Sequence, residues 1–142
     1  MTAKQLSVFI ENRKGRLGEV LSVLKKNGVN ILSLSLADTT EYGLLRLIVS
    51  NAQEAKDKLS LEGFSTMLTD VIIIKIVHQV GSLQNLLETL SQTDINVEYM
   101  YGLSTEGKDA FVVLKASDMK LADEILNRQG IETLSTEDIL GL

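Results

Sequence analysis

The sequence contains no cysteine, no proline and a single histidine. Without cysteine there is no disulfide framework, no thiolate ligand for a metal and no cysteine nucleophile. One histidine without a carboxylate or cysteine cluster makes neither a zinc site nor a catalytic triad. The lack of proline leaves glycine and asparagine to supply most of the turns. These absences exclude several classes of enzyme, and we predict no catalytic site, no metal and no cofactor in this chain.

The chain also has no net positive charge and no long apolar run. A formal net charge of −5 and a pI near 4.9 oppose the electrostatics of nucleic-acid binding. The longest near-continuous apolar run, residues 71–77, contains Lys75 and is too short to span a bilayer. No basic segment followed by an apolar stretch opens the chain, so we expect no signal peptide. We therefore expect a cytoplasmic protein with no nucleic-acid or membrane partner.

Residues 9–36 hold the clearest periodic pattern. A helix of about three turns is predicted by apolar residues at the spacing i, i+3, i+4 and i+7, namely Leu17, Val20, Leu21 and Leu24. The opposite face is charged and is expected to be exposed to water; it carries Arg16, Glu19, Lys25 and Lys26. Gly28 stands where a left-handed residue ends a helix. After it, Leu32, Leu34 and Leu36 alternate with serines, which predicts a strand with one face in a core.

Similar patterns extend this stretch into a complete unit. Further strands are predicted over residues 5–10, 44–49 and 64–68. A second helix is expected to begin at Ser50 or Asn51, with Glu54 as its capping-box partner, and to end at Gly63. The order is β-α-β-β-α-β, and both helices must cover one face of an antiparallel sheet to make a core. This is the ferredoxin-like arrangement of the α+β class, with the first and last strands close together in the sheet.

The same pattern returns at an offset of 66 residues. Gly15 corresponds to Gly81, Leu24 to Leu90, and the register holds through two strands, which indicates an internal duplication. The second copy has a predicted strand at 71–77, a helix at 82–92, a hairpin near 95–115, a helix capped by Ser117 and a last strand around 131–135. We expect two domains, 1–69 and 70–142, with almost no linker, because only residues 69–70 stand between the adjacent predicted strands. Units of this size are marginal alone, so we expect them to dock and to form a homodimer.

Residues 11–17, Glu-Asn-Arg-Lys-Gly-Arg-Leu, and residues 28–31, Gly-Val-Asn-Ile, together resemble the signature of the ACT domain. This family is an amino-acid-sensing regulatory module of βαββαβ fold, and the resemblance covers nearly the whole chain twice. Lys14 stands where proline is common in the family, whereas Gly15 is retained. The second copy diverges more, with His78 in the place of Asn12 and a turn led by Asp94 in place of glycine.

The resemblance implies that a free amino acid binds where the loop into the first helix meets the start of the second strand, commonly at an interface between two such domains. A helix N-terminus offers N–H groups and partial positive charge to the ligand's carboxylate. The implied ligand-binding residues of the first unit are Asn12, Gly15, Arg16, Leu17 and Asn30. Those of the second unit are His78, Gly81, Ser82, Leu83 and Asn96. The sequence leaves open which set is occupied.

Several of these residues have a second interpretation. Asn30 and Asn96 could instead cap the preceding turn by bonding their own backbone. Gly15 and Gly81 could be helix-entry glycines without a ligand. The basic residues Arg13, Lys14 and Arg16 could contact a phosphate or carboxylate, or form a solvated loop.

Two further features stay open in the same way. His78 is expected at the surface or in contact with the ligand. Tyr99 and Tyr101 alternate and therefore share one strand face, where their rings fill a domain interface or stack on a ligand.

From these observations we predict a regulatory protein that binds a free amino acid and signals to an amino-acid metabolic enzyme or another partner. Its mechanism would be linkage, in which the ligand favours one domain arrangement and the partner responds to that arrangement. The alternative is an assembly or regulatory subunit that acts through protein contacts only, which the divergent second loop favours. A small ferredoxin-like enzyme would need convergent acid-base groups, which the sequence does not show.

Overall fold

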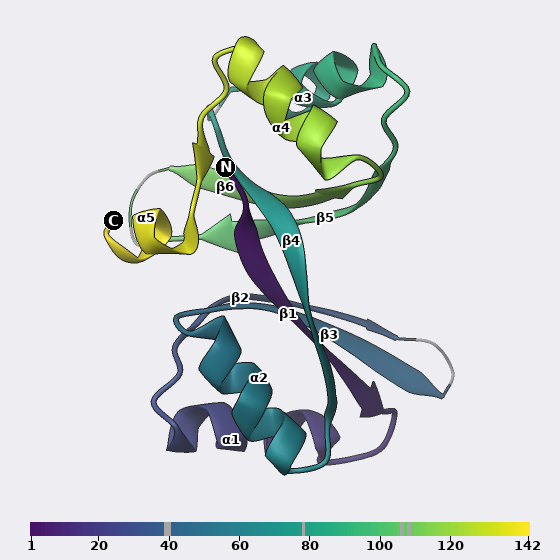
Figure 1. Cartoon of the computed structure of the whole chain (residues 1–142), viewed down its shortest axis with the longest axis vertical. Coiled ribbons are helices and arrows are strands. Elements are labelled where there is room, and N and C mark those ends of the chain that lie inside the picture. Colours follow the sequence, from purple (N-terminus) through teal and green to yellow (C-terminus); the bar gives the residue numbers. More distant parts are fainter. Residues whose placement is uncertain (39–40, 78, 106, 108) are drawn as a thin grey trace. The chain divides into compact units, whose positions relative to one another are not determined.

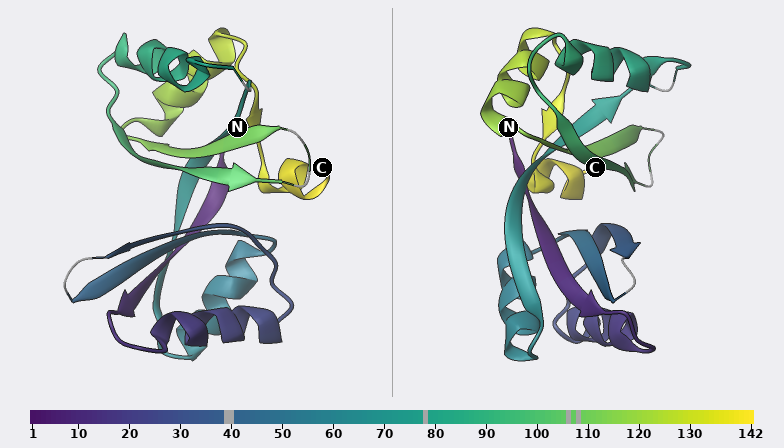
Figure 2. Two further views of the ribbon diagram at one scale, coloured as in Figure 1. Left: turned by 180° about the vertical axis from the view of Figure 1, so that it is seen from behind. Right: turned by 90° about the vertical axis from the view of Figure 1, so that its right-hand side faces the viewer.

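The computed structural model describes residues 1–38, 41–77, 79–105, 107 and 109–142, with the backbone alone described for Asp38. The chain divides into two compact units. We call Lys4–Thr69 the first unit, and Asp70–Leu142 together with Met1–Ala3 the second unit. In each unit the two longer helices lie on one side of an antiparallel sheet (Figure 1), and the further views of Figure 2 show the same layering. The two ferredoxin-like βαββαβ repeats are thus confirmed.

The first unit contains the expected order of elements. They are β1 (Ala3–Glu11), α1 (Arg16–Lys26), β2 (Ile31–Asp38), β3 (Tyr42–Val49), α2 (Ala52–Leu61) and the first residues of β4 (Ser65–Ile76). Strand β3 pairs antiparallel with both β1 and β2, so that Leu47 lies opposite Leu6 on one side and Leu34 on the other. Gly28 has φ +68° and follows the C-cap of α1, as predicted. Asn51 caps α2, accepting from the Glu54 N–H at 3.1 Å.

The core of the first unit lies between its sheet and its two helices. It is formed by Leu6, Val8, Ile10, Val20, Leu24, Val29, Leu45, Leu47, Val49, Ala55, Leu59 and Phe64. Two members of the predicted α1 stripe, Val20 and Leu24, are fully buried, and Leu17 packs partly against them. Val23, rather than the predicted Leu21, completes the contact. Leu21 is partly buried but is not among the residues packed against this core.

The predicted burial of β2 is wrong. Leu34 and Leu36 lie opposite Leu47 and Leu45, so they point to the core side of the sheet. They nevertheless remain 49% and 46% exposed, because β2 is the end strand of the sheet. Alternation in a sequence identifies the face of a strand, but it does not show whether a helix covers that face.

The second unit repeats the order. It continues β4 and adds α3 (Ser82–Ser91), β5 (Val97–Ser104), β6 (Ala110–Ala116), α4 (Met119–Arg128), β7 (Thr133–Leu134) and α5 (Thr136–Leu140). Strand β4 pairs antiparallel with β6, through Ile72 and Leu114, and with β7, through Ile73 and Leu134. The first and last strands of this unit are therefore neighbours, as predicted. The core consists of Ile72, Ile74, Leu86, Leu90, Ile95, Leu114, Ala116, Ala122, Ile125 and Leu126.

Three local predictions need correction. The strands expected at 64–68 and 71–77 form one continuous strand, β4, because nothing in residues 69–70 breaks an extended backbone. The cap of α4 is Asp118 rather than Ser117: the Asp118 carboxylate accepts from the Leu121 N–H at 3.0 Å. Helix α5 is absent from the predicted elements, although Ser135 and Asp138 form a capping box at its start. The domain boundaries 1–69 and 70–142 stay a prediction.

Candidate ligand-binding site

The loop into α1 is held by a short series of backbone hydrogen bonds. The Arg13 N–H donates to the Glu11 carbonyl at 2.8 Å, and the Arg16 N–H donates to the Arg13 carbonyl at 3.3 Å. The Glu19 N–H then donates to the carbonyl of Gly15 at 3.0 Å and begins the helix. Gly15 itself has φ +92° and ψ −14°, in the left-handed region that other residues rarely adopt. A glycine is therefore required at this helix entry.

The described residues of the loop into α3 repeat these hydrogen bonds. The Gln79 N–H donates to the Val77 carbonyl at 2.8 Å. The Ser82 N–H donates to the Gln79 carbonyl at 3.2 Å, and the Asn85 N–H donates to the Gly81 carbonyl at 3.0 Å. Each bond joins the positions 66 residues after those of the first loop. Gly81 has φ +88° and ψ −3°. The duplication seen in the sequence thus extends to the hydrogen bonds of the loop.

Both helices begin without a side-chain cap. A methyl group built onto Gly15 or Gly81 would meet no other atom within 4 Å. In each first turn the N–H of the first helical residue is already bonded within the loop, and the helix dipole adds partial positive charge at both helix starts. Leu17 and Leu83, each second in its helix, belong to these two turns. Such an end can accept a carboxylate, but every uncapped helix shares this property.

The predicted asparagines lie next to serines that precede the second helix of each unit. The N–H of Asn30 donates to the Ser50 hydroxyl at 2.9 Å, and its carbonyl accepts from the Ser50 N–H at 2.9 Å. Asn96 makes the same two bonds with Ser117, at 2.9 and 2.8 Å. These bonds use the asparagine backbone, and both residues are exposed. Asn12 is also exposed, and its N–H donates to the Glu41 carbonyl at 3.0 Å.

Arg16 does not face water as predicted. Its side chain is only 16% exposed, and its guanidinium carbon lies 4.2 Å from the centroid of the Phe64 ring. One terminal nitrogen donates to the Glu19 carboxylate at 2.6 Å, whereas the buried Nε has no partner among the described residues. The neighbouring Arg13 pairs with Glu11 at 2.9 Å and is exposed. Arg16 is thus a packed residue, and Arg13 belongs to a solvated loop.

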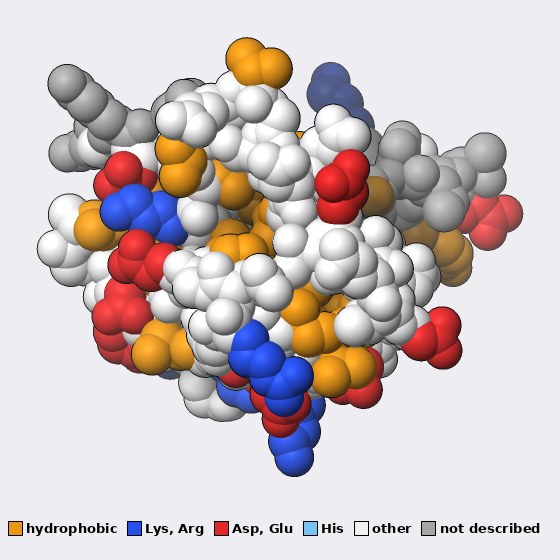
Figure 3. Space-filling model, turned by 90° about the horizontal axis from the view of Figure 1, so that it is seen from above, with side chains coloured by type: hydrophobic (Ala, Val, Ile, Leu, Met, Phe, Trp, Pro, Cys, Tyr) orange, Lys and Arg blue, Asp and Glu red, His pale blue; other side chains and the backbone are white. Residues whose placement is uncertain are grey.

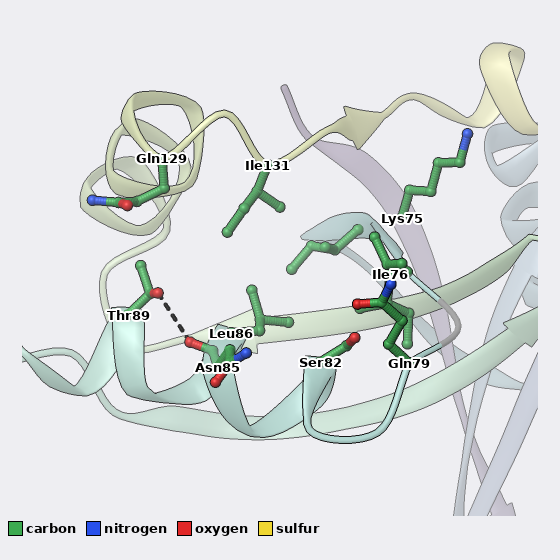
Figure 4. Close-up of a pocket in the computed structure, with 11 residues that line it drawn as sticks. Lys75, Ile76, Gln79, Ser82, Asn85, Leu86, Thr89, Gln129 and Ile131 are labelled. Atoms are coloured by element: carbon green, nitrogen blue, oxygen red, sulfur yellow. Dashed lines mark hydrogen bonds between the residues drawn. The ribbon is translucent and has the colours of Figure 1, made fainter.

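The second unit has a cavity of about 360 Å³ between α3 and the link from α4 to β7. Its floor is apolar and consists of Ile74, Ile76, Leu86 and Ile131. Uncharged polar side chains surround the floor, namely Gln79, Ser82, Asn85, Thr89 and Gln129 (Figure 4). The Thr89 hydroxyl donates to the Asn85 carbonyl at 2.9 Å. In Figure 3, which looks onto the helices of this unit, apolar atoms show between uncharged side chains near the middle of the face.

Of the predicted residues of the second unit, Ser82 lines this cavity, and Gly81 and Leu83 flank it along the chain. Asn96 is not part of the lining, and His78 lies outside the described residues. The sequence-based prediction missed Asn85 and Thr89, although they follow Ser82 at i+3 and i+7 on one face of α3. Gln129 and Ile131 carried no such signal, because only the tertiary fold brings them to α3.

Other kinds of site find no support in the described ranges. Among residues 1–38, 41–77, 79–105, 107 and 109–142, no three or more His, Cys, Asp and Glu residues are grouped to hold a metal ion. No helix in the same ranges is long and apolar enough to cross a membrane. The one lysine in the cavity lining, Lys75, has its ammonium 3.5 Å from Asp109 and 3.7 Å from Glu132.

Comparison with solved structures gives three informative relatives. Protein BT0572 from Bacteroides thetaiotaomicron is 37% identical, with a TM-score of 0.92 over 100% of this chain and 98% of that chain. The regulatory subunit of aspartate kinase from Thermus thermophilus is 16% identical, with a TM-score of 0.60 over 88% of this chain and 91% of that one. The corresponding subunit from Thermus flavus is 18% identical, with a TM-score of 0.62 over 87% of this chain and 88% of that chain. Because both identities are low, the likeness to the two kinase subunits shows that they share the fold of this chain and nothing more.

The search of curated proteins found no match. A family model described as the ACT domain pair matches residues 1–142. This match covers the whole chain, both units and both glycine-containing loops. The chain therefore belongs to the ACT domain pair family.

Proposed function

We propose that this protein is a regulatory protein that binds a free amino acid and has no catalytic site of its own. The observation that carries the proposal is the duplicated helix entry: in both units a left-handed glycine precedes an uncapped helix N-terminus, with the same three backbone bonds. Such an end is suited to the α-carboxylate of an amino acid. Membership of the ACT domain pair family supports the same conclusion.

Regulation would follow from linkage. A ligand that binds one conformation better than another shifts the population toward it, and a partner protein can respond to that shift. The likeness to regulatory subunits of aspartate kinase suggests an enzyme of amino-acid metabolism as the partner. In this proposal the protein acts in the cytoplasm as a homodimer, without nucleic-acid or membrane contacts.

A thermal-shift screen against the twenty amino acids tests the sensing function. A ligand that binds only the folded protein stabilises it by RT ln(1 + [L]/Kd), about 2.7 kcal/mol at a hundredfold excess over Kd. One or two amino acids should therefore raise the melting temperature clearly. A flat screen, repeated by calorimetry, would contradict the proposal.

Substitutions then map the two predicted sets. Asn12→Ala with Asn30→Ala tests the first unit, and His78→Ala with Asn96→Ala tests the second. Asn127→Ala is a matched control, because this exposed asparagine near the end of α4 belongs to neither set. Loss of the thermal shift in one double variant, with the control unchanged, would assign the site to that unit.

The second candidate is an assembly subunit whose ligand sites are no longer used. The divergent loop of the second unit, with Val77 and Gln79 in place of Glu11 and Arg13, favours it. This candidate predicts a stable complex with a partner enzyme whose affinity does not change when amino acids are added. Affinity measured with and without each amino acid separates the two candidates.

A further inference from the structure

We propose that the cavity of the second unit is the ligand-binding compartment and accepts the uncharged side chain of an amino acid, whereas in the first unit Arg16 packs on Phe64 and carboxylates line the corresponding hollow. This inference rests on the proposed function and adds to it which unit binds and which class of ligand it takes.

The two units can be compared position by position around this space. Through β5 the offset is 66 residues, so that Ser82 corresponds to Arg16 and Asn85 to Glu19. From β6 on the offset is 67, because Leu114 pairs with Ile72 as Leu47 pairs with Leu6, which places one inserted residue before β6. Two observations fix this second offset. Gly63 and Gly130 both have positive φ. The residue that follows each glycine donates its N–H to a leucine carbonyl. Phe64 donates to Leu59 at 3.1 Å, and Ile131 donates to Leu126 at 3.0 Å.

In the first unit a side chain of the protein itself packs beside this space. The Arg16 guanidinium lies over Phe64 and donates to Glu19. The floor counterparts Val8, Ile10 and Val20 are buried, as Ile74 and Leu86 are in the second unit, whereas Ile76 is only partly buried. The first unit has a hollow of about 540 Å³ at the corresponding place, lined by Gly15, Gly18, Glu19, Ser22, Val23, Glu62 and Phe64. Its lining contains the carboxylates of Glu19 and Glu62 and none of these three apolar residues.

In the second unit the same positions carry small and uncharged side chains. Serine replaces Arg16, asparagine replaces Glu19, and Ile131 replaces the larger Phe64. The floor residues Ile76 and Leu86 therefore line an open cavity of about 360 Å³, at the lower end of the range for small-molecule pockets, roughly 300–1,000 Å³.

The chemistry of the lining selects the ligand class. Amide and hydroxyl groups surround an apolar floor, and the single charge, on Lys75, lies within 4 Å of two carboxylates. A charged ligand side chain would lose its hydration without gaining a counter-ion, which is unfavourable. An uncharged side chain with an apolar body and one polar group at most fits the lining. The ligand's carboxylate would remain at the open end, near the N-terminal turn that Ser82 begins.

Isothermal titration calorimetry tests the assignment with the tightest-binding uncharged amino acid of the thermal-shift screen. The double variant Ser82→Arg/Asn85→Glu gives the second unit the arrangement of the first, and we expect at least tenfold weaker binding. The matched control Ser91→Arg/Asn127→Glu makes the same replacements at exposed positions outside the lining, and we expect its affinity to stay within twofold of the wild type. Far-ultraviolet circular dichroism checks that each variant is folded. Ile131→Phe, which introduces the side chain found at Phe64, is a milder filling variant if the double variant does not fold.

NMR provides an independent measurement. Addition of the same amino acid to labelled wild-type protein should shift the amide signals of Thr89 and Gln129 and leave those of Val23 and Glu62 unchanged. Binding that survives both filling variants but is lost in Asn12→Ala/Asn30→Ala would overturn this inference and preserve the proposed function. A preference for aspartate, glutamate, lysine or arginine would also overturn it. If no amino acid binds the wild type, the proposed function fails together with the inference.

Discussion

The described residues of the two helix-entry loops make the same backbone hydrogen bonds, but different side chains lie beside them. At both helix entries a left-handed glycine is flanked by three matching backbone bonds, whose lengths agree within 0.1 Å. In the first unit Arg16 packs on Phe64 beside this loop, and in the second unit Ser82 and Ile131 leave a cavity. After a duplication, the backbone bonds of a loop can therefore be retained while a few side chains change the space beside it.

The largest expected change in stability concerns the hydrophobic cores of the two units, which have equivalent positions. Leu24 and Leu90 occupy matching positions in α1 and α3, and each is 1% exposed. Truncation of a buried leucine to alanine removes apolar contacts and leaves a cavity, which costs about 2–5 kcal/mol. Leu24→Ala and Leu90→Ala should each lower the free energy of unfolding in urea by this amount. Leu61→Ala is the control, since Leu61 is 81% exposed. A loss below about 1 kcal/mol in either core variant would contradict the equivalence.

The helix-entry glycines should also behave alike. Gly15→Ala and Gly81→Ala place a Cβ at positive φ, and each should destabilise the protein by about 1–2 kcal/mol although the surrounding space is empty. Gly18→Ala is the matched control, because Gly18 lies within α1 and has no neighbour within 4 Å of the new methyl group. This control should be stabilising by up to about 1 kcal/mol. If the loop variants are as stable as the control, backbone conformation does not explain why both loops carry glycine.

Arg16 is where the units differ most, and its removal should reveal a structural role. Arg16→Ser loses the contact with Phe64 and the bond to Glu19, and we expect a loss of about 1 kcal/mol of stability in chemical denaturation. Arg128→Ser serves as the control, because Arg128 is 73% exposed and pairs with Glu124 only at 3.9 Å. An exposed pair of this kind is worth little, so the control should change stability by less than about 0.5 kcal/mol. An equal loss of stability in Arg16→Ser and Arg128→Ser would show that the packing of Arg16 on Phe64 does not stabilise the first unit.

The smallest effect concerns α5, which belongs to the second unit. The Ser135 N–H donates to the Asp138 carboxylate at 2.9 Å. This bond is the largest cause that lowers the pKa of Asp138 below its ordinary value of 3.8, and hydrogen bonding with the Ser135 side chain is the second. A carboxyl group with a lowered folded-state pKa stabilises the protein above the unfolded-state pKa and loses this effect as the pH falls through the folded value. The stability difference between wild type and Asp138→Asn should therefore be present at neutral pH and shrink below pH 3.8.

Titration by NMR measures this pKa directly. In Ser135→Ala the hydroxyl contribution is lost while the backbone bond can remain, so the pKa of Asp138 should rise part of the way toward its ordinary value. An unchanged pKa would mean that the capping hydroxyl does not act on the carboxylate.

Much of the fold followed from local patterns in the sequence. The helical spacing of Val20 and Leu24, the end of α1 at Gly28 and the cap at Asn51 all have causes within a few residues. The offset of 66 residues predicted the second unit from the first. Local patterns also had limits: they selected Ser117 as a cap, although Ser117 bonds Asn96, 21 positions earlier in the chain.

The sequence by itself determined the order of the elements, the faces they bury and the duplication, because periodicity and capping depend on neighbours along the chain. Only the tertiary structure decided that Leu34 and Leu36 stay exposed on an end strand, and that Arg16 packs on Phe64 in one unit whereas Ser82 and Ile131 line a cavity in the other. The reason is that a cavity depends on side chains far apart in the sequence. Phe64 meets Arg16 across 48 positions, and Ile131 faces Ser82 across 49, and no local pattern encodes either distance.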